Sequence, residues 1–348
     1  MIIPDPPAAS LRLRIDRRAL GNNWRALDRL SGKADAGAAV KADAYGIGVS
    51  HAMPALIDAG AREFFVAHWS EVPPLLDYVT GSSIAVLHGV RNAEEAAFAR
   101  TTNAVPVVNS IAQAALWSQT GGGRCHLMVD SGINRLGIAA SQASDDAVRA
   151  LDIDILMSHL ACADEDSPQN ARQLQVFRDV APKIEARRLS IGNSAGIALG
   201  ADYHFDVTRP GIALYGGIPH PALQDCIAQV AFPEAAILQV RDLSTGDSVG
   251  YNAMWTADRW VRAATVSIGY ADGFLRARGR NGVLQWHGRD LPILGRVSMD
   301  MVVIDLLDSD AAEGDFLTVP FDIEHLAQST GLSQYELLTV LGSRYSRD

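Results

Sequence analysis

Hydrophobic and polar positions along the first two thirds of the chain follow a pattern typical of a parallel sheet. Short apolar runs, most of them ending in a polar residue, are separated by stretches with apolar residues at helical spacing. The runs predict buried strands, and the stretches predict amphipathic helices. The predicted strands are 38–41, 64–67, 84–88, 105–109, 126–130, 153–159, 188–193 and 212–215, and the predicted helices are 51–59, 71–78, 93–100, 111–118, 141–151 and 170–186. This alternation predicts an α/β fold, a (β/α)8 barrel of the TIM type.

The pattern changes after about residue 216. Runs rich in Val, Ile and Thr are then separated by Gly, Asp, Ser and Asn turns, without intervening helices, at 235–240, 262–268, 283–286, 291–294 and 301–306. Such spacing predicts a mostly antiparallel β domain. We therefore expect a barrel over 11–226 and a β domain over 227–348, with residues 1–15 pairing with the second domain.

Composition narrows the class of protein. The 348 residues are 48% hydrophobic and 20% charged, which is enough to build a large core. A net charge of −10 disfavours binding to nucleic acid or to an anionic membrane. The three cysteines show neither disulfide nor metal-ligand spacing, and no apolar run reaches membrane-spanning length. We expect a cytoplasmic, soluble protein with a small-molecule substrate and no metal.

Polar residues follow the predicted barrel strands, and active sites of such barrels lie at the carboxyl ends of their strands. The residues at these ends are Lys41, His88, Asn109, Asp130 with Arg135, His159, Asn193 with Ser194, and Arg209 with Gly211. Taken singly, each is also typical of a helix cap or a hydrogen-bonded surface group.

Lys41 follows the apolar run 38–40, which holds it on a stiff element. Burial there lowers the pKa of an amine, and a partly desolvated amine forms a Schiff base with a carbonyl cofactor. A lysine extending its charge from the barrel rim remains the alternative. Tyr45 and its neighbouring glycines could approach an anion, and so could the turn 192–196 and the amides of Gly211 and Ile212. These glycines are equally typical of ordinary turns.

Seven segments distributed along the chain resemble the alanine racemase family. They are VKADAYG (40–46), VDSGINRLG (129–137), NSA (193–195), RPGIALYG (209–216), VGY (249–251), IGYADG (268–273) and GRVSMD (295–300). The resemblance implies a barrel followed by a β domain and the cofactor pyridoxal 5′-phosphate (PLP).

It also implies catalytic roles. Lys41 is then the Schiff-base lysine and the base on one face of the substrate Cα, and Tyr251 is the base on the other face. Inverting a stereocentre through a planar carbanion needs proton transfer on both sides. In the family the tyrosine comes from the partner in a head-to-tail homodimer with shared active sites. By itself, Tyr251 is equally typical of a packing tyrosine in a turn.

The remaining roles are likewise carried over from the resemblance. Arg209 lies beside the cofactor's ring nitrogen and is oriented by His159, and Arg135 contacts the cofactor and the substrate carboxylate. The other cofactor-binding residues are Tyr45, Asn193, Ser194, Gly211 and Ile212. Met299 offers its backbone N–H to the carboxylate, and Tyr270 with Arg276 narrows the substrate entrance. Core packing beside a turn is the alternative for Met299 and Tyr270.

Three positions depart from the family pattern. Met128 stands where the family has a lysine, often carbamylated, that braces the arginine at position 135. Ile47 replaces a histidine, and Ser343 replaces a tyrosine on the phosphate side.

The resemblance implies interconversion of L-alanine and D-alanine, for D-alanine biosynthesis and peptidoglycan precursor supply. A racemase of broader specificity stays open. A PLP-dependent decarboxylase on the same plan has an acidic residue at the ring nitrogen and a Cys-Glu-Ser motif, and neither feature is present. A PLP carrier without turnover is typically a lone barrel.

Overall fold

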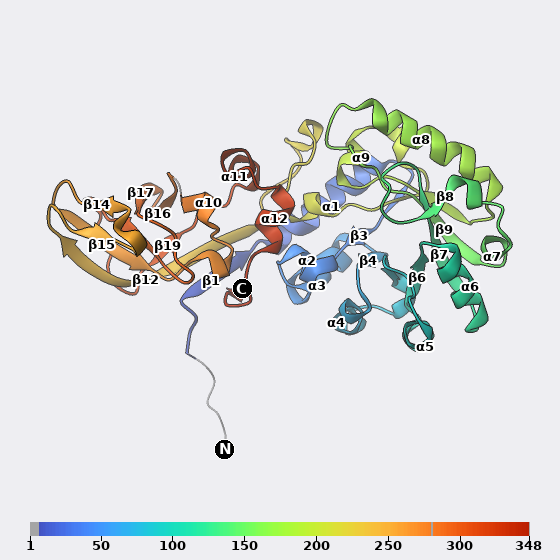
Figure 1. Cartoon of the computed structure of the whole chain (residues 1–348), viewed down its shortest axis with the longest axis horizontal. Helices are drawn as coiled ribbons and strands as arrows, with labels where there is room; N and C mark the ends of the chain where they lie inside the picture. Colours follow the sequence, from blue (N-terminus) through green and yellow to red (C-terminus); the bar gives the residue numbers. More distant parts are fainter. Residues whose placement is uncertain (1–6, 280, 348) are drawn as a thin grey trace, which may run out of the picture. The chain divides into compact units, whose positions relative to one another are not determined.

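The computed structural model describes residues 7–279 and 281–347, and the chain divides into two compact units (Figure 1). One unit is the continuous segment Arg17–Ala228. The other combines the chain up to Asp16 with the chain from Gln229 onward. Residues 1–6, included in the predicted pairing of the N-terminal segment with the second domain, lie outside the described residues.

The first unit is a barrel of parallel strands. Its main sheet has the order β10 (Arg188–Ser190), β9 (Asp152–Met157), β7 (Arg124–Asp130), β6 (Val105–Val108), β5 (Ile84–Val86), β4 (Phe64–Val66) and β3 (Ala38–Ala39), with β8 (Ile138–Ala139) added on β7. A second pairing joins β2 (Asp35–Ala36) to β11 (Val207–Thr208). Hydrogen bonds from Ala39 N to Pro210 O and from Arg209 N to Gly192 O, 2.9 and 2.8 Å long, close the ring. The predicted TIM-type architecture is therefore confirmed.

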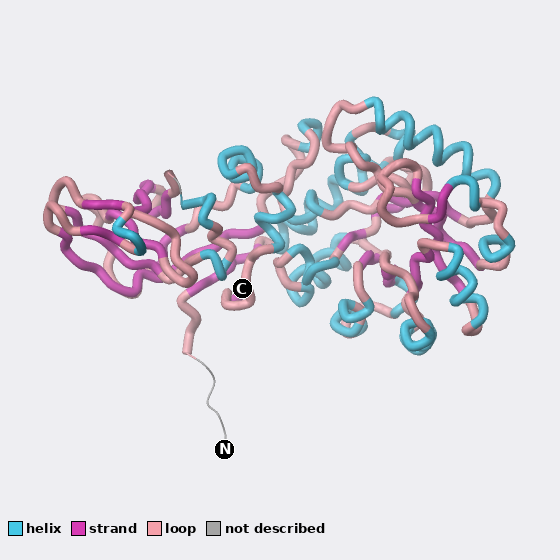
Figure 2. The backbone as a smooth tube through the Cα atoms, viewed as in Figure 1, coloured by secondary structure: helices cyan, strands magenta, loops and turns pink. Residues whose placement is uncertain are grey.

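Helices lie on the outside of these strands, as Figures 1 and 2 show for α5, α6 and α8. The helices of this unit are α1 (Arg17–Ser31), α3 (Val49–Ala59), α4 (Pro73–Leu76), α5 (Ala93–Thr102), α6 (Ile111–Gln119), α7 (Asp146–Arg149), α8 (Pro168–Val180) and α9 (Ser194–Ala198). The starts of α5, α6 and α8 are encoded locally: Asn92, Ser110 and Ser167 each accept a hydrogen bond from the first turn of the helix that follows.

Two features of this unit differ from the sequence-based expectation. The eighth strand, predicted at 212–215, is wrong: Ile212–Tyr215 forms a buried 3-10 turn, η6, and the eighth strand is the two-residue β11. An apolar run reports burial, but it does not distinguish a strand from a tight turn. Helix α1 was not predicted, because Gly21 and two asparagines weaken its helical pattern. One of these, Asn23, is buried and donates to the carbonyl oxygen of Leu214.

The second unit is mostly antiparallel, as predicted, and its sheet closes into a barrel. Its sheet has the order β15 (Val261–Val266), β18 (Val302–Asp305), β17 (Arg289–Leu294), β16 (Val283–Trp286), β19 (Phe316–Thr318), β12 (Ala231–Leu243), β1 (Leu11–Ile15) and β20 (Ser346–Arg347). The long strand β12 pairs with β1 and β19 through its first half and with β15 through its second half, which closes the barrel.

Short elements complete this unit. A small hairpin joins β13 (Ser248–Val249) to β14 (Trp255–Thr256), and three helices occur where none was expected: α10 (Arg276–Gly279), α11 (Ile323–Thr330) and α12 (Gln334–Thr339). Helix α12 begins in a capping box between Ser333 and Glu336. Within residues 7–279 and 281–347, no helix is long and apolar enough to cross a membrane.

Candidate active site

Lys41 lies two residues after β3 and opens a short left-handed turn, α2 (Lys41–Tyr45). Ala42, Asp43 and Ala44 have φ angles of 54°, 51° and 54°, and Tyr45 has a φ of 56°. Left-handed backbone costs about 1–2 kcal/mol for each residue with a Cβ atom. Four consecutive residues of this kind require stabilising contacts from the surrounding structure.

Two carboxylates supply such contacts. Glu71 belongs to the turn η1 (Trp69–Glu71) that follows β4, and its Oε1 accepts the N–H of Ala42 at 2.5 Å. Its Oε2 accepts the N–H groups of Ala67 and His68 at 2.7 and 2.9 Å. Within the turn, Asp43 Oδ1 accepts the N–H of Val49 at 2.8 Å. Hydrogen bonds to Glu71 thus hold the turn that carries Lys41 against the end of the neighbouring strand β4.

The environment of Lys41 favours a neutral amine. Burial lowers the pKa of Lys41, and the positive charges of Arg135 and Arg209 lower it further, whereas Glu71 acts in the opposite direction. An amine with a lowered pKa is a better nucleophile at neutral pH. Arg135 and Arg209 are thus the cations whose charges act on Lys41.

Tyr45, Ser194 and Gly211 lie together beside this turn. The Tyr45 ring stacks on that of Tyr215 with centroids 4.8 Å apart. A Cβ atom at position 211 would lie 2.3 Å from the Tyr45 hydroxyl oxygen, so only glycine fits there. Ser194 Oγ accepts the N–H of Gly211 at 2.8 Å.

Asn193 and Ile212 flank the same cluster. Asn193 Oδ1 accepts the N–H of Gly196 at 2.8 Å and so caps α9. The side chain of Asn193 therefore has a structural role. Ile212 is buried, and its N–H has no acceptor among the described residues. The hydroxyl groups of Tyr45 and Ser194 and the backbone N–H of Ile212 form a donor set that fits an anion such as a phosphate.

Arg209 is a buried cation held by backbone and hydroxyl groups. It donates to the carbonyl oxygen of Ser158 at 2.6 Å and to the hydroxyl of Ser190. Burial lowers the pKa of Arg209 to about 10, so the side chain stays charged at neutral pH. The serines were not singled out from the sequence, although Ser190 is the buried last residue of β10.

His159 is neutral in this environment. Burial, with the positive charges of Arg209 and Arg135, lowers the pKa of His159 to about 3. Within the described part of the chain, the hydrogen bonds that hold Arg209 come from Ser158 and Ser190. The direct hydrogen bond expected from His159 to Arg209 is not among them.

Arg135 extends from a turn after β7 and is exposed. Asp130 builds this turn, because its Oδ1 accepts the N–H groups of Gly132, Ile133 and Asn134 at 2.8, 3.0 and 3.1 Å. Met128, which occupies the lysine position of the family pattern, is buried in β7 and offers no charge to Arg135.

The other two candidates at strand ends have local contacts. The rings of His68 and His88 meet edge to face with centroids 4.3 Å apart. Burial, with the charges of His68 and Lys41 among the further causes, lowers the pKa of His88. Asn109 donates to the carbonyl oxygens of Leu87 and Val107 at 2.9 and 2.7 Å, which is a structural role.

The β unit carries the remaining predicted residues on adjacent loops. Tyr270 starts the turn η9 (Tyr270–Asp272) and donates its N–H to Ser298 O at 3.1 Å. Met299, 53% exposed, accepts the N–H of Ala271 at 3.0 Å. The guanidinium of Arg276 lies 5.3 Å from the Tyr270 ring centroid. Tyr270, Arg276 and Met299 are therefore neighbours.

Tyr251 is 71% exposed, more than any other large hydrophobic side chain among the described residues. It follows Gly250, with a φ of 74°, and precedes Asn252, with a φ of 64°. A Cβ atom at Gly295 would lie 3.0 Å from the carbonyl oxygen of Val249, so the Tyr251 loop adjoins the segment that leads to Met299.

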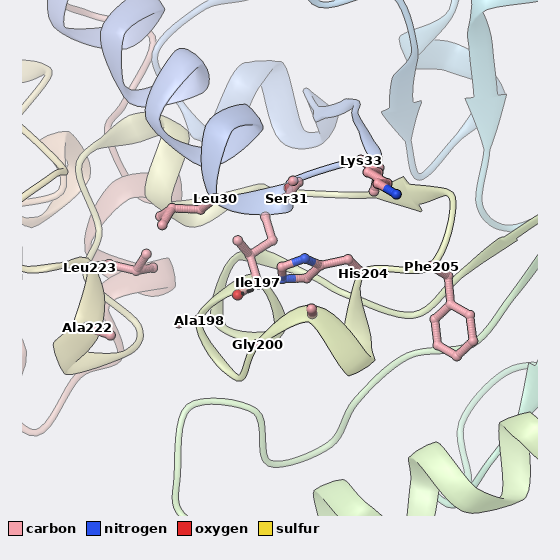
Figure 3. Close-up of a pocket in the computed structure, with 13 residues that line it drawn as sticks. Leu30, Ser31, Lys33, Ile197, Ala198, Gly200, His204, Phe205, Ala222 and Leu223 are labelled. Carbon is pink, nitrogen blue, oxygen red and sulfur yellow. Dashed lines mark hydrogen bonds between the residues drawn. The ribbon is translucent and has the colours of Figure 1, made fainter.

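A pocket of about 610 Å³ in the barrel unit lies elsewhere (Figure 3). Leu30 and Lys33 line it from the end of α1 and the segment before β2, and His204 lines it from the segment before β11. These residues mark the amino ends of the strands, whereas Lys41 lies at the carboxyl ends. None of the predicted site residues lines this pocket.

Comparison with known proteins agrees with the geometry. The family models for the alanine racemase N-terminal and C-terminal domains match residues 15–219 and 230–348. An alanine racemase of Rhizobium meliloti is 42% identical, covering 99% of this chain and 98% of that protein. A biosynthetic alanine racemase of Agrobacterium fabrum is 40% identical, covering 97% and 93%.

Solved structures show the same fold. The alanine racemase of Bartonella henselae, a structure with covalently bound pyridoxal phosphate, superposes with a TM-score of 0.90 at 34% identity, covering 98% of this chain and 99% of that one. The biosynthetic alanine racemase of Pseudomonas aeruginosa superposes with a TM-score of 0.86 at 30% identity, covering 98% and 99%. Both halves of the molecule have counterparts in these proteins, and the chain belongs to the alanine racemase family.

Proposed function

We propose that this chain is a PLP-dependent alanine racemase that interconverts L-alanine and D-alanine, with Lys41 and Tyr251 as bases on opposite faces of the substrate Cα. The observation that carries the proposal is a lysine at the carboxyl end of a barrel strand, beside a set of anion-binding donors, in a chain of this family. The biological setting that follows is D-alanine supply for peptidoglycan, in the cytoplasm.

The residues around Lys41 fit PLP. When bound, PLP supplies a carbonyl group that reacts with amines and a ring that withdraws electrons from Cα. Lys41 provides the amine, and the hydroxyl groups of Tyr45 and Ser194, with the amide of Ile212, provide donors for the phosphate. Arg209 remains charged at neutral pH and is suited to donate a hydrogen bond to the ring nitrogen.

Racemisation needs one base on each side of Cα. Lys41 removes or returns a proton on one face, and the phenol of Tyr251 does so on the other. Arg135 and the backbone N–H of Met299 orient the substrate carboxylate, since planar cations and amides suit its two oxygens. Tyr270, beside Arg276, narrows the entrance.

We further propose a head-to-tail homodimer in which each β unit completes the partner's site. A tyrosine that is 71% exposed has no second surface to hold a substrate against it and to exclude water, and a partner subunit would supply one. The β unit also exposes several large apolar side chains, namely Met254, Trp260, Met299 and Met301. Where exposed apolar groups gather into one patch, they are typical of a surface that is covered in an assembly.

The first test is spectroscopic. Purified protein should show a visible chromophore that borohydride reduces, and it should racemise D-alanine. Lys41→Ala should abolish the chromophore. Tyr251→Phe should keep it but lose most α-proton exchange from one enantiomer, while Tyr78→Phe, at a 37% exposed position, should behave as wild type. Unchanged exchange from both enantiomers in Tyr251→Phe would remove this residue from the mechanism.

The second test concerns shared sites. A mixed dimer of Lys41→Ala and Tyr251→Phe subunits contains one doubly altered site and one intact site, if each site draws one base from each subunit. Random mixing of the two inactive variants should therefore restore about a quarter of wild-type activity. No recovery, in subunits shown to exchange, would contradict the head-to-tail arrangement.

The competing PLP-dependent decarboxylase predicts CO2 release from an amino acid. The charged Arg209 speaks against it, because a decarboxylase of this plan places a carboxylate at the ring nitrogen. Release of CO2 at a rate comparable to racemisation would favour that alternative.

A further inference from the structure

We propose that Glu71 is a positioning residue for Lys41: its carboxylate holds the left-handed turn that presents the lysine and faces the lysine's ammonium group with a negative charge. This inference rests on the proposed role of Lys41 as the cofactor-binding amine. Glu71 was not singled out from the sequence, where it lies in a predicted helix.

The geometry gives Glu71 two tasks at once. Oε2 closes its own turn by accepting the N–H groups of Ala67 and His68, while Oε1 reaches across to the N–H of Ala42, the residue that follows Lys41. A comparable turn at Ala140–Gln142 is closed by an amide, because Gln142 Oε1 accepts the N–H of Ala139 at 2.9 Å. Closing such a turn therefore needs only one oxygen. The second oxygen of Glu71 is left for the turn of Lys41.

The contact supplies a bond that the left-handed turn does not make within itself. The turn is closed by Ala44 N to Val40 O, Gly46 N to Ala42 O and Gly48 N to Asp43 O, each 2.9 Å long. The N–H of Ala42, which begins the turn, is held by Glu71. Loss of this bond frees the residue next to Lys41 to relax toward ordinary backbone angles.

Charge gives the second argument. The groups whose charges couple to that of Lys41 are the cations Arg135 and Arg209, the histidines His88 and His159, and the carboxylate of Glu71. Burial and both arginines lower the pKa of Lys41, and Glu71 is the acidic group that raises it. Glu71 therefore limits how readily the amine loses its proton.

Two substitutions, compared with each other, separate the two tasks of Glu71. If the glutamine oxygen closes the local turn, as Gln142 does, its NH2 group faces the N–H of Ala42, and two donors repel. Glu71→Gln thus removes both the contact and the charge. Glu71→Asp keeps the charge but is one methylene too short to reach both sides, so it removes mainly the contact.

The first test measures the titration of individual lysines, which is practical because the chain contains few of them. The chain has three, Lys33, Lys41 and Lys183, so reductive methylation with 13C-formaldehyde gives few resonances to follow by NMR. Lys33 and Lys183 are exposed and serve as internal controls. In cofactor-free protein, Glu71→Gln should lower the titration midpoint of Lys41 and leave the other two unchanged. Glu336→Gln, at the capping box of α12, is the matched control and should leave all three unchanged.

Cofactor affinity is the second readout. Loss of a hydrogen bond to a charged acceptor should weaken PLP binding about tenfold or more in both Glu71→Gln and Glu71→Asp. Only Glu71→Gln should also move the Lys41 midpoint. An unchanged midpoint in Glu71→Gln, or unchanged affinity in both variants, would overturn the proposal. Should Glu71→Gln fail to fold, the affinity of Glu71→Asp decides.

The same protein distinguishes this failure from failure of the proposed function. If PLP does not protect Lys41 of the wild type from methylation, the role of Lys41 as the cofactor-binding amine is wrong, whatever Glu71 does. If PLP protects Lys41 and the Glu71 variants behave as wild type, only the positioning role is wrong.

Discussion

The left-handed turn at Lys41 reverses the usual effect of an alanine-to-glycine substitution. Ala42 is exposed and has a φ of 54° and a ψ of 49°. Replacing it by glycine removes a cost of about 1–2 kcal/mol, because glycine has no Cβ atom to clash in this region. Glycine adds about 0.5–1 kcal/mol of unfolded-state entropy. The balance is a stabilisation of about 0.5–1 kcal/mol for Ala42→Gly.

Ala97 provides the matched control, since it is also exposed but lies inside the ordinary right-handed helix α5. Ala97→Gly should destabilise by about 1 kcal/mol. Both positions belong to the unit Arg17–Ala228, so both report on unfolding of the same unit. Urea denaturation measures the difference in the free energy of unfolding between each variant and the wild type, with the m-value held constant. If Ala42→Gly destabilised as much as Ala97→Gly, the reasoning about the strained turn would be refuted.

Two further predictions concern buried charges in the barrel. Burial lowers the pKa of His126 to about 3. Between pH 6.5 and 3 the unfolded state therefore binds one more proton than the folded state, and the free energy of unfolding falls by about 1.4 kcal/mol for each unit by which the pH is lowered. His126→Gln should flatten this slope in acid unfolding, and His325→Gln, at an exposed position, should not. Asp154 is buried and pairs with Arg124 and Arg188 at 2.6 and 2.9 Å, so Asp154→Ala should cost about 3 kcal/mol. Asp152→Ala, which breaks an exposed pair, should cost less than about 1 kcal/mol in the same urea titration; equal costs would contradict the argument.

Much of the fold could be predicted because its strands are continuous apolar runs that end in polar residues. The barrel, the β unit and the strand-end position of Lys41 all follow from that pattern. The eighth strand could not be placed, because β11 contains only two residues and the more apolar run at 212–215 follows it. Burial of Tyr215 and its neighbours in η6 produces the same local signal as a strand.

Part of the candidate site could be predicted from the sequence for a similar reason. Residue types at strand ends and the family resemblance identified Lys41 and Arg209, but their supporting contacts lie on other elements. Glu71 approaches Lys41 through a turn after the next strand, and Ser190 reaches Arg209 from β10. Such contacts depend on which strands lie side by side in the barrel and on how the loops after them fold, which no local pattern encodes. The left-handed turn could not be predicted either, because four residues with Cβ atoms adopt backbone angles that glycine usually adopts.

The pairing of β1 with both β12 and β20 sets an order of events during synthesis. Strand β1 leaves the ribosome early, yet its antiparallel partner begins at Ala231 and its parallel partner is Ser346–Arg347. The intervening barrel segment is continuous in sequence and has its partners at hand as it emerges. The nascent N-terminal strand must therefore wait, unpaired, until translation of the barrel is over, and this interval is when aggregation through its free edge is most to be expected.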